Sequence, residues 1–121
     1  MLYTTITVRE KELKLRLDAN MTVQIEKAIG KNPLNVVMGM NDGEMPKLGD
    51  LLTILWGALQ KYNHGYTMTK VWELYDAYVA DGKSMSDLVL VVMEIFKASG
   101  FIKEEEPEEY DENSEDDEKN A

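Results

Sequence analysis

The chain has 121 residues, no cysteine and a formal net charge of −10 at pH 7. The lack of cysteine excludes disulfides, thiolate metal ligands and cysteine nucleophiles. Eleven acidic and two basic residues fall within residues 103–121, a net charge of −9, which leaves residues 1–102 almost neutral. We therefore expect one folded domain at residues 1–102 and a disordered acidic tail at residues 103–121, where few apolar residues offset the charge.

Charge and hydropathy also restrict the partners. No apolar run approaches the ~18 to 20 residues that span a membrane, and residues 1–9 lack the basic start and apolar centre of a signal peptide. A neutral domain with an anionic arm repels phosphate instead of binding it. We expect a cytoplasmic protein with neither a membrane nor a nucleic acid as its partner.

The first expected element is a β-hairpin. Residues 5–8 alternate polar and apolar side chains, and residues 13–17 alternate leucine with Lys14 and Arg16. Only Glu10–Lys11 separates the two strands, so they should be antiparallel neighbours. The leucines should face helices, because a lone hairpin is marginally stable, and Lys14 and Arg16 should face water.

Two short helices are expected next. After Asn20 the apolar residues recur at helical spacing, and Gly30 is a suitable left-handed terminator. The apolar face of this helix consists of Met21, Ile25, Ala28 and Ile29. The Asn32–Pro33 pair then supplies a cap and a first-turn proline for a brief helix through Met38 that ends near residues 41–43.

The next two expected helices are longer. Pro46 opens the first of them, and Asn63–Gly65 interrupts the pattern after it. Its broad apolar stripe consists of Leu48, Leu51, Leu52, Ile54, Leu55, Ala58, Leu59 and Tyr62. Thr67 can cap the following helix, which stops at Asp81–Gly82. One face of that helix is expected to hold Val71, Trp72, Tyr75 and Val79.

The last expected helix covers Leu88–Ala98. Ser84 and Asp87 resemble a capping box, and Gly100 supplies a stop. Residues 88–96 leave almost no polar face, which indicates either a central helix or an edge strand, and the length favours a helix. The predicted fold is mainly α, with an N-terminal β-hairpin, a compact bundle of about five helices and the acidic tail.

Motifs of catalysis are missing from the sequence. His64 is the single histidine, sits in an Asn-His-Gly turn and is expected to be a surface loop residue. The nucleotide-binding, hydrolase and zinc-protease motifs do not occur, and the acidic residues of the domain are scattered. We expect no enzyme, no metal and no cofactor.

A surplus of aromatic and methionine residues is the most informative feature of the domain. Each one alone is more often core than surface. Together they also suit an adaptable groove for the helix of another protein. The expected partner-binding residues are Trp56, Trp72, Tyr75 and Tyr78, and the methionines considered with them are Met38, Met40, Met45, Met68, Met85 and Met93.

Three segments of the chain resemble the tail assembly chaperones of long-tailed phages and prophages. They are the hairpin residues 12–17, the helix end at residues 25–30 followed by Asn32–Leu34, and the leucine-rich residues 51–59. Glu26, four residues before Gly30, also fits that pattern. The matching parts span most of residues 1–102, and they are apolar patterns instead of chemical signatures.

This resemblance implies a non-enzymatic role in virion assembly. Such chaperones keep the long helical tape measure protein soluble and bring tail tube subunits to it in the host cytoplasm, and they are absent from the mature virion. The resemblance leaves self-association open. Many are also made in a longer form by a programmed frameshift. Residues 118–120 can be encoded GAA AAA AAC, which contains a slippery heptamer in the required frame, although a Lys119 codon of AAG would remove it.

The acidic tail leaves a second function open. The tail can prevent aggregation through its charge, bind basic segments of a partner, or mimic phosphate groups. In the last case the protein is an acidic decoy that inhibits a basic nucleic-acid-binding partner. A rigid acidic surface is more typical of such mimics than a flexible end.

Overall fold

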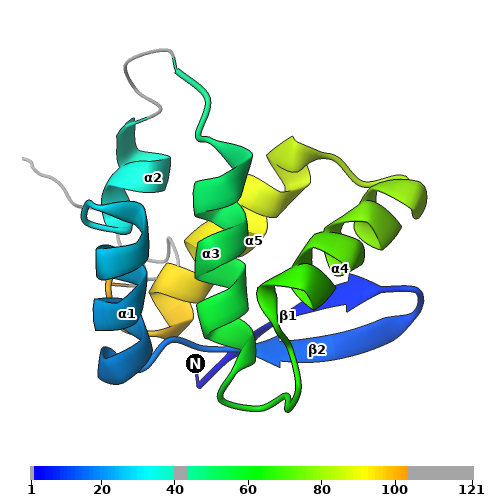
Figure 1. The fold of residues 1–121 in the computed structure, drawn as a ribbon, viewed down its shortest axis with the longest axis horizontal. Helices are drawn as coiled ribbons and strands as arrows, with labels where there is room; N and C mark the ends of the chain where they lie inside the picture. Colours follow the sequence, from blue (N-terminus) through cyan, green and yellow to red (C-terminus); the bar gives the residue numbers. More distant parts are fainter. Residues whose placement is uncertain (1, 40–43, 104–121) are drawn as a thin grey trace, which may run out of the picture.

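A computed structural model describes residues 2–39 and 44–103. It confirms the predicted mainly α fold, a hairpin followed by five helices (Figure 1). The elements are β1 (Thr4–Val8), β2 (Lys11–Leu15), α1 (Ala19–Ile29), α2 (Leu34–Met38), α3 (Leu48–Leu59), α4 (Met68–Ala80) and α5 (Met85–Ala98). Apart from Lys103, the expected disordered tail lies outside the described residues.

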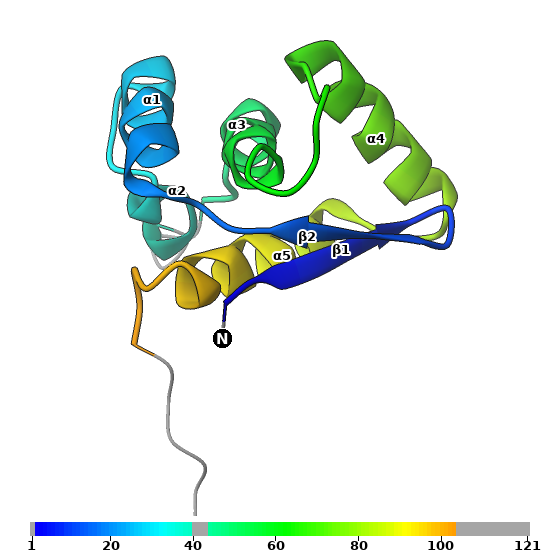
Figure 2. The same cartoon turned by 90° about the horizontal axis from the view of Figure 1, so that it is seen from below.

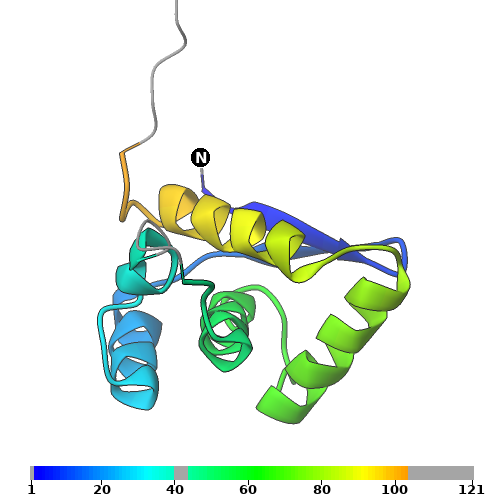
Figure 3. The same ribbon diagram turned by 90° about the horizontal axis from the view of Figure 1, so that it is seen from above.

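The elements form two layers. Figure 2 shows α1, α3 and α4 on one side of a layer made by the hairpin and α5, and Figure 3 gives the same arrangement from above. Helix α3 lies between α1 and α4 and also contacts α5 and β2. The central helix is therefore α3, and α5 runs along the hairpin with one side that no described helix or strand covers.

The hairpin turn differs from the prediction. Thr4 pairs with Leu15 and Val8 with Lys11, so the turn consists of Arg9 and Glu10. Both turn residues have positive φ values, 54° and 65°, a geometry that glycine and asparagine adopt at lower cost. The turn is held to the α4–α5 loop, because the Arg9 backbone N–H donates to Asp81 Oδ2 over 2.6 Å.

The leucines of the hairpin are buried as predicted, and Lys14 is exposed. The prediction that Arg16 faces water is wrong. Its guanidinium donates to the carbonyl oxygens of Leu2, over 2.8 Å, and Ala98, over 2.6 Å. Arg16 therefore ties the start of the chain and the end of α5 to β2, because five donors on one rigid group can serve several carbonyls.

Most of the expected helix ends are confirmed. The Thr67 side chain accepts from Lys70 N, and Ser84 and Asp87 form the reciprocal capping box at the start of α5. Gly30 has a left-handed φ of 76° after α1. Helix α1 begins earlier than predicted because the Asp18 side chain accepts from the backbone N–H of Met21.

Helix α2 is short, as predicted. The backbone N–H of Leu34 donates to Asn32 Oδ1 over 3.0 Å, and Pro33 has helical dihedral angles. The helix ends at Met38, whereas the predicted end near residues 41–43 lies in a part that is not described.

Two expected core residues lie on the surface. Ala28 is exposed, and the buried position of α1 beside Ile25 belongs to Thr22, whose hydroxyl donates to the Asp18 carbonyl oxygen over 2.7 Å. Tyr62 follows the end of α3, where its ring meets Tyr3 edge to face at a centroid distance of 5.7 Å. The predicted apolar stripe of α3 therefore extended one turn too far.

The buried face of α4 also differs from the prediction. Val71 and Tyr78 are buried, Leu74 and Tyr75 are half-buried, and Trp72 is 54% exposed. Residues 71, 74, 75 and 78 form the inward stripe at ordinary helical spacing. Val79, expected on the same face as Val71, is exposed, so that prediction is wrong.

Helix α5 starts three residues before the predicted boundary and is no edge strand. Its inward face is buried through Phe96 and the residues one and two turns before it, whereas Leu90 is 61% exposed. None of the helices in the described ranges is both long and apolar enough to cross a membrane.

Candidate partner-binding surface

The four residues predicted to bind a partner do not form one exposed surface. Trp72 projects from α4 with 54% of its surface exposed, and Tyr78 on the same helix is buried, with 3% exposed. Trp56 on α3 and Tyr75 on α4 are half-buried against the core. Of these four, Trp72 alone is therefore freely available to a partner in this structure.

Tyr78 belongs to the core. Its ring packs against Tyr75 at a centroid distance of 6.4 Å and a tilt of 39°. Burial raises the pKa of the Tyr78 hydroxyl, and the negative charge of Asp87 and the neighbouring Tyr75 add to the rise. Tyr78 is therefore a core residue and is not exposed to a partner in this structure.

An apolar hollow lined by described residues lies on the exposed side of α5. It has a volume of about 310 Å³ and is lined by Met45, Ser86, Val89, Leu90 and Met93. Leu90 and Met45 are 61% and 56% exposed, and Met93 is half-buried. We call these five residues the α5 hollow. Its walls are aliphatic and thioether groups, and Ser86 is its single polar member.

The local sequence explains why this hollow exists. Residues 88–93 read Leu-Val-Leu-Val-Val-Met, so apolar side chains point to every side of the helix. Helix α5 packs on α2, α3 and β1, which cover the faces of Leu88 and Val92 but leave Leu90 outside. Met45, just before α3, adds a flexible wall whose thioether adapts to different neighbours.

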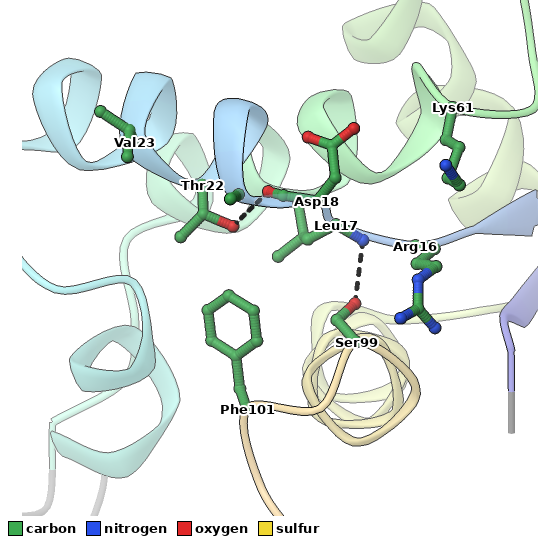
Figure 4. Close-up of a pocket in the computed structure, with 9 residues that line it drawn as sticks. Arg16, Leu17, Asp18, Thr22, Val23, Lys61, Ser99 and Phe101 are labelled. Atoms are coloured by element: carbon green, nitrogen blue, oxygen red, sulfur yellow. Dashed lines mark hydrogen bonds between the residues drawn. The ribbon is translucent and has the colours of Figure 1, made fainter.

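A larger hollow, of about 630 Å³, lies where α1 meets the end of α5 (Figure 4). Several of its polar groups are bonded within the protein. Ser99 Oγ accepts from the Leu17 backbone N–H over 2.9 Å, and the Thr22 hydroxyl donates to the Asp18 carbonyl oxygen. Phe101 faces the same space. The bond between Leu17 and Ser99 holds the start of α1 to the end of α5.

The part of the chain that the structure describes contains no candidate metal-binding site. No group of three or more histidine, cysteine or acidic side chains in residues 2–39 and 44–103 is placed to hold a metal ion. His64 is exposed, as predicted, and lines a shallow hollow with Lys11, Lys70 and Glu73.

Comparison with known proteins establishes the family. The family of unknown function DUF6096 matches residues 2–120, almost the whole chain. The chain belongs to this family. No curated protein and no solved structure matches it.

Within this DUF6096 chain, sequence reasoning missed Leu90 as a surface candidate, and it included Met45 and Met93 only in the methionine surplus. It also did not anticipate that the buried Val89 lines the hollow. The available signal was the absence of a polar face over residues 88–96. A helix in a domain of about 100 residues is rarely enclosed on all sides. An all-apolar helix therefore indicates an exposed apolar strip as well as a buried one.

Proposed function

We propose that this protein is a non-enzymatic chaperone that holds an amphipathic helix of another protein in the α5 hollow. The resemblance to phage tail assembly chaperones makes the tape measure protein the proposed client and the tail tube protein a second partner. The proposed setting is the cytoplasm of the host during virion assembly, and the finished particle does not retain the chaperone.

The exposed Leu90 side chain is the observation that supports this proposal. An isolated surface leucine is ordinary, but Leu90 lines a hollow whose other lining residues, apart from Ser86, are also apolar. Fully burying a leucine contributes about 1.5–3 kcal/mol. A helix that covers Leu90 and places one of its own side chains beside Met45 and Met93 therefore gains apolar burial on both partners.

Methionines suit this task because a chaperone must accept several client segments. Their unbranched side chains repack around different shapes at low cost. Met45 comes from the segment before α3 and Met93 from α5, so the two can adjust independently. The same hollow can then hold successive helices of a long client.

Co-expression with a tape measure segment tests the proposal. The wild-type chain should keep the segment soluble, and Leu90→Asp should lose this activity because a carboxylate must be desolvated on binding. Val23→Asp is the matched control, since Val23 is 46% exposed on α1 and receives the same charge. Both variants should keep the wild-type circular dichroism spectrum and Tm.

The possible results test the chaperone activity and the location of the client site separately. Failure of the wild-type chain to keep any segment soluble contradicts the chaperone proposal. Equal activity of wild type and Leu90→Asp places the client elsewhere, and loss of activity in Trp72→Ala would then identify the exposed side of α4.

The proposed second, longer product depends on the gene. Lys119 should be encoded AAA and Asn120 AAC or AAT, with an open minus-one frame beyond the stop. Any other lysine codon, or an early stop in that frame, removes the frameshift and leaves the chaperone proposal intact. Both residues lie outside the described part of the chain.

A further inference from the structure

We infer that the outer edge of β1 pairs with the same edge of a second copy of this chain, which joins two hairpins into one four-stranded sheet. This inference goes beyond the proposed function and does not depend on the α5 hollow or its client. It follows from the backbone groups at the two edges of the hairpin.

The two strands of the hairpin differ in what covers their outer edges. On β2, the Lys14 carbonyl oxygen accepts from Asn63 Nδ2 over 2.8 Å. The Arg16 backbone N–H, just beyond β2, donates to the Ala58 carbonyl oxygen over 3.0 Å. Helix α3 and the segment after it therefore cover this edge. Figures 2 and 3 show β1 at the margin of the described fold, with no described helix or strand alongside its other edge.

Thr5 and Thr7 carry the backbone groups of the open edge. In a hairpin with a two-residue turn, the residues that flank the turn, Val8 and Lys11, form a hydrogen-bonded pair, and bonded pairs alternate with non-bonded ones. Thr5 and Thr7 therefore point their N–H and C=O groups away from β2. Among the described residues these groups have no hydrogen-bond partner. An unpaired row of this kind is a template for another strand.

Strand β1 lacks the features that protect an edge strand from pairing. Its sequence, Thr-Thr-Ile-Thr-Val, consists of β-branched residues and contains no charge and no proline. Its five consecutive pairs with β2 leave no room for a bulge. Residues of this kind favour a sheet, whereas a protected edge carries lysine, proline or a bulge. Pairing would also extend a two-stranded sheet to a size that is more stable.

A second copy fits this edge by symmetry. If the twofold axis passes through Ile6, the middle residue of β1, then Thr5 of each copy lies opposite Thr7 of the other. These two positions are then hydrogen-bonded pairs, so all the outward N–H and C=O groups of Thr5 and Thr7 find partners. Threonine pairs across two strands also stabilise a sheet.

The charges of β2 favour this register. Lys14 lies opposite Thr5, and Glu12 lies opposite Thr7. Each outer row of the joined sheet therefore begins with Lys14 of one copy and ends with Glu12 of the other. A shift by two residues would instead place two lysines or two glutamates at the ends of one row. Because these ends are ~14 Å apart at a strand spacing of about 4.8 Å, the charges bias the register and the backbone bonds supply the affinity.

The oligomeric state of the full-length protein tests the inference. Light scattering from about 10 μM to about 1 mM should show a monomer–dimer equilibrium with a Kd below about 100 μM. Thr7→Pro should raise this Kd at least about tenfold, because proline lacks the outward N–H and leaves the bonds to β2 in place. Thr7→Val keeps the N–H and should dimerise like the wild type. Both variants should keep the wild-type circular dichroism spectrum.

Amide exchange on the wild-type protein tests the same edge without a substitution. Protection of the Thr5 and Thr7 amides should rise as the protein concentration passes through the Kd. The Glu12 amide is the matched control, because it points outward from β2, away from the proposed contact. Its exchange should be independent of concentration.

Three results would overturn the inference. They are a wild-type protein that stays monomeric at about 1 mM, a dimer that Thr7→Pro leaves intact, and Thr5 and Thr7 amides that exchange at one rate at all concentrations. A dimer that Leu90→Asp dissociates and Thr7→Pro does not would place the interface on α5 and also overturn it. Light scattering requires no client, so failure to keep a tape measure segment soluble would contradict the chaperone proposal alone.

Discussion

Gly57 should be essential to the packing of α1 against α3. A Cβ atom at this position would lie 2.5 Å from Ile25 Cδ1, 3.1 Å from Ile25 Cγ1 and 3.4 Å from Leu17 Cδ2. Ile25 and Leu17 are 0% and 2% exposed, so neither side chain can move into solvent. Overpacking of this kind costs about 1–3 kcal/mol, against a gain of about 1 kcal/mol from replacing a helical glycine by alanine.

Gly57→Ala should therefore lower the free energy of unfolding by up to about 2 kcal/mol, measured by urea denaturation. Gly49, near the start of the same helix, has open space where a Cβ atom would lie, with no tertiary neighbour within 4 Å. Gly49→Ala should consequently leave stability unchanged or raise it by up to about 1 kcal/mol. Comparing Gly57→Ala with Gly49→Ala therefore distinguishes the cost of overpacking from the gain in helix propensity.

A double-mutant cycle with Ile25→Val identifies the atom responsible. Valine lacks the Cδ1 atom that the new methyl group meets, so Gly57→Ala should cost less in the Ile25→Val background than in wild type. A stabilising effect of Gly57→Ala equal to that of Gly49→Ala would refute the close packing of α1 and α3. Additive effects in the cycle would show that Ile25 is not the obstacle.

Three further predictions concern the hairpin, the core and the α5 cap. Replacing Arg9–Glu10 by Asn-Gly should raise the free energy of unfolding in urea by about 1 kcal/mol, because both turn residues have positive φ. The replacement keeps the backbone N–H bond to Asp81 and removes the partly exposed ion pair between Arg9 Nε and Asp81 Oδ1 at 3.6 Å, which contributes little. A lower free energy of unfolding would contradict a strained turn. Burial raises the folded-state pKa of Tyr78 above 10.0, so the stability that its neutral hydroxyl contributes is complete below pH 10 and is lost as the pH rises through the folded pKa. Tyr78→Phe should therefore reduce the fall in the free energy of unfolding at alkaline pH. Parallel curves of stability against pH for the two proteins would argue against burial of the hydroxyl. Ser84→Ala should lower the free energy of unfolding, measured by thermal denaturation, by about 1 kcal/mol, whereas Ser86→Ala on the surface should leave it unchanged. An equal loss of stability in the two variants would argue against the capping box.

Local signals predicted most of the secondary structure. Ser84 and Thr67 supply side-chain oxygens just before their helices, and Gly30 supplies a left-handed residue just after one. Each signal acts within four residues, so it can be recognised without knowledge of the fold. The hairpin turn was misplaced by one residue because Arg9 and Glu10 carry no turn signature, and the Asp81 contact that supports them lies 72 residues away in sequence.

The orientation of α4 could not be predicted from its pattern. Val71 and Tyr78 lie on one stripe and Trp72 and Val79 on another, and both stripes are apolar with a spacing of seven residues. Packing of α4 on α3 and β1 selects the first stripe. The aromatic residues were therefore divided between core and surface by tertiary contacts.

The position of the α5 hollow was not predicted from the sequence. The surplus of methionine and aromatic residues led to an expected site at Trp56, Trp72, Tyr75 and Tyr78, and none of these four residues lines the hollow. Its position depends on which side of α5 remains uncovered after α2, α3 and β1 have packed. That outcome depends on contacts between residues far apart in the chain, which apolar periodicity alone does not encode.

Methionine methyl NMR during titration with a client helix tests the central claim most directly. The chain has eight methionines, and Met45 and Met93 line the α5 hollow, whereas Met21 lies on α1 and Met68 at the start of α4. We predict that binding shifts or broadens the signals of Met45 and Met93 and leaves those of Met21 and Met68 unchanged. Perturbation of Met68 or Met21 with unchanged Met45 and Met93 would contradict a client site on α5.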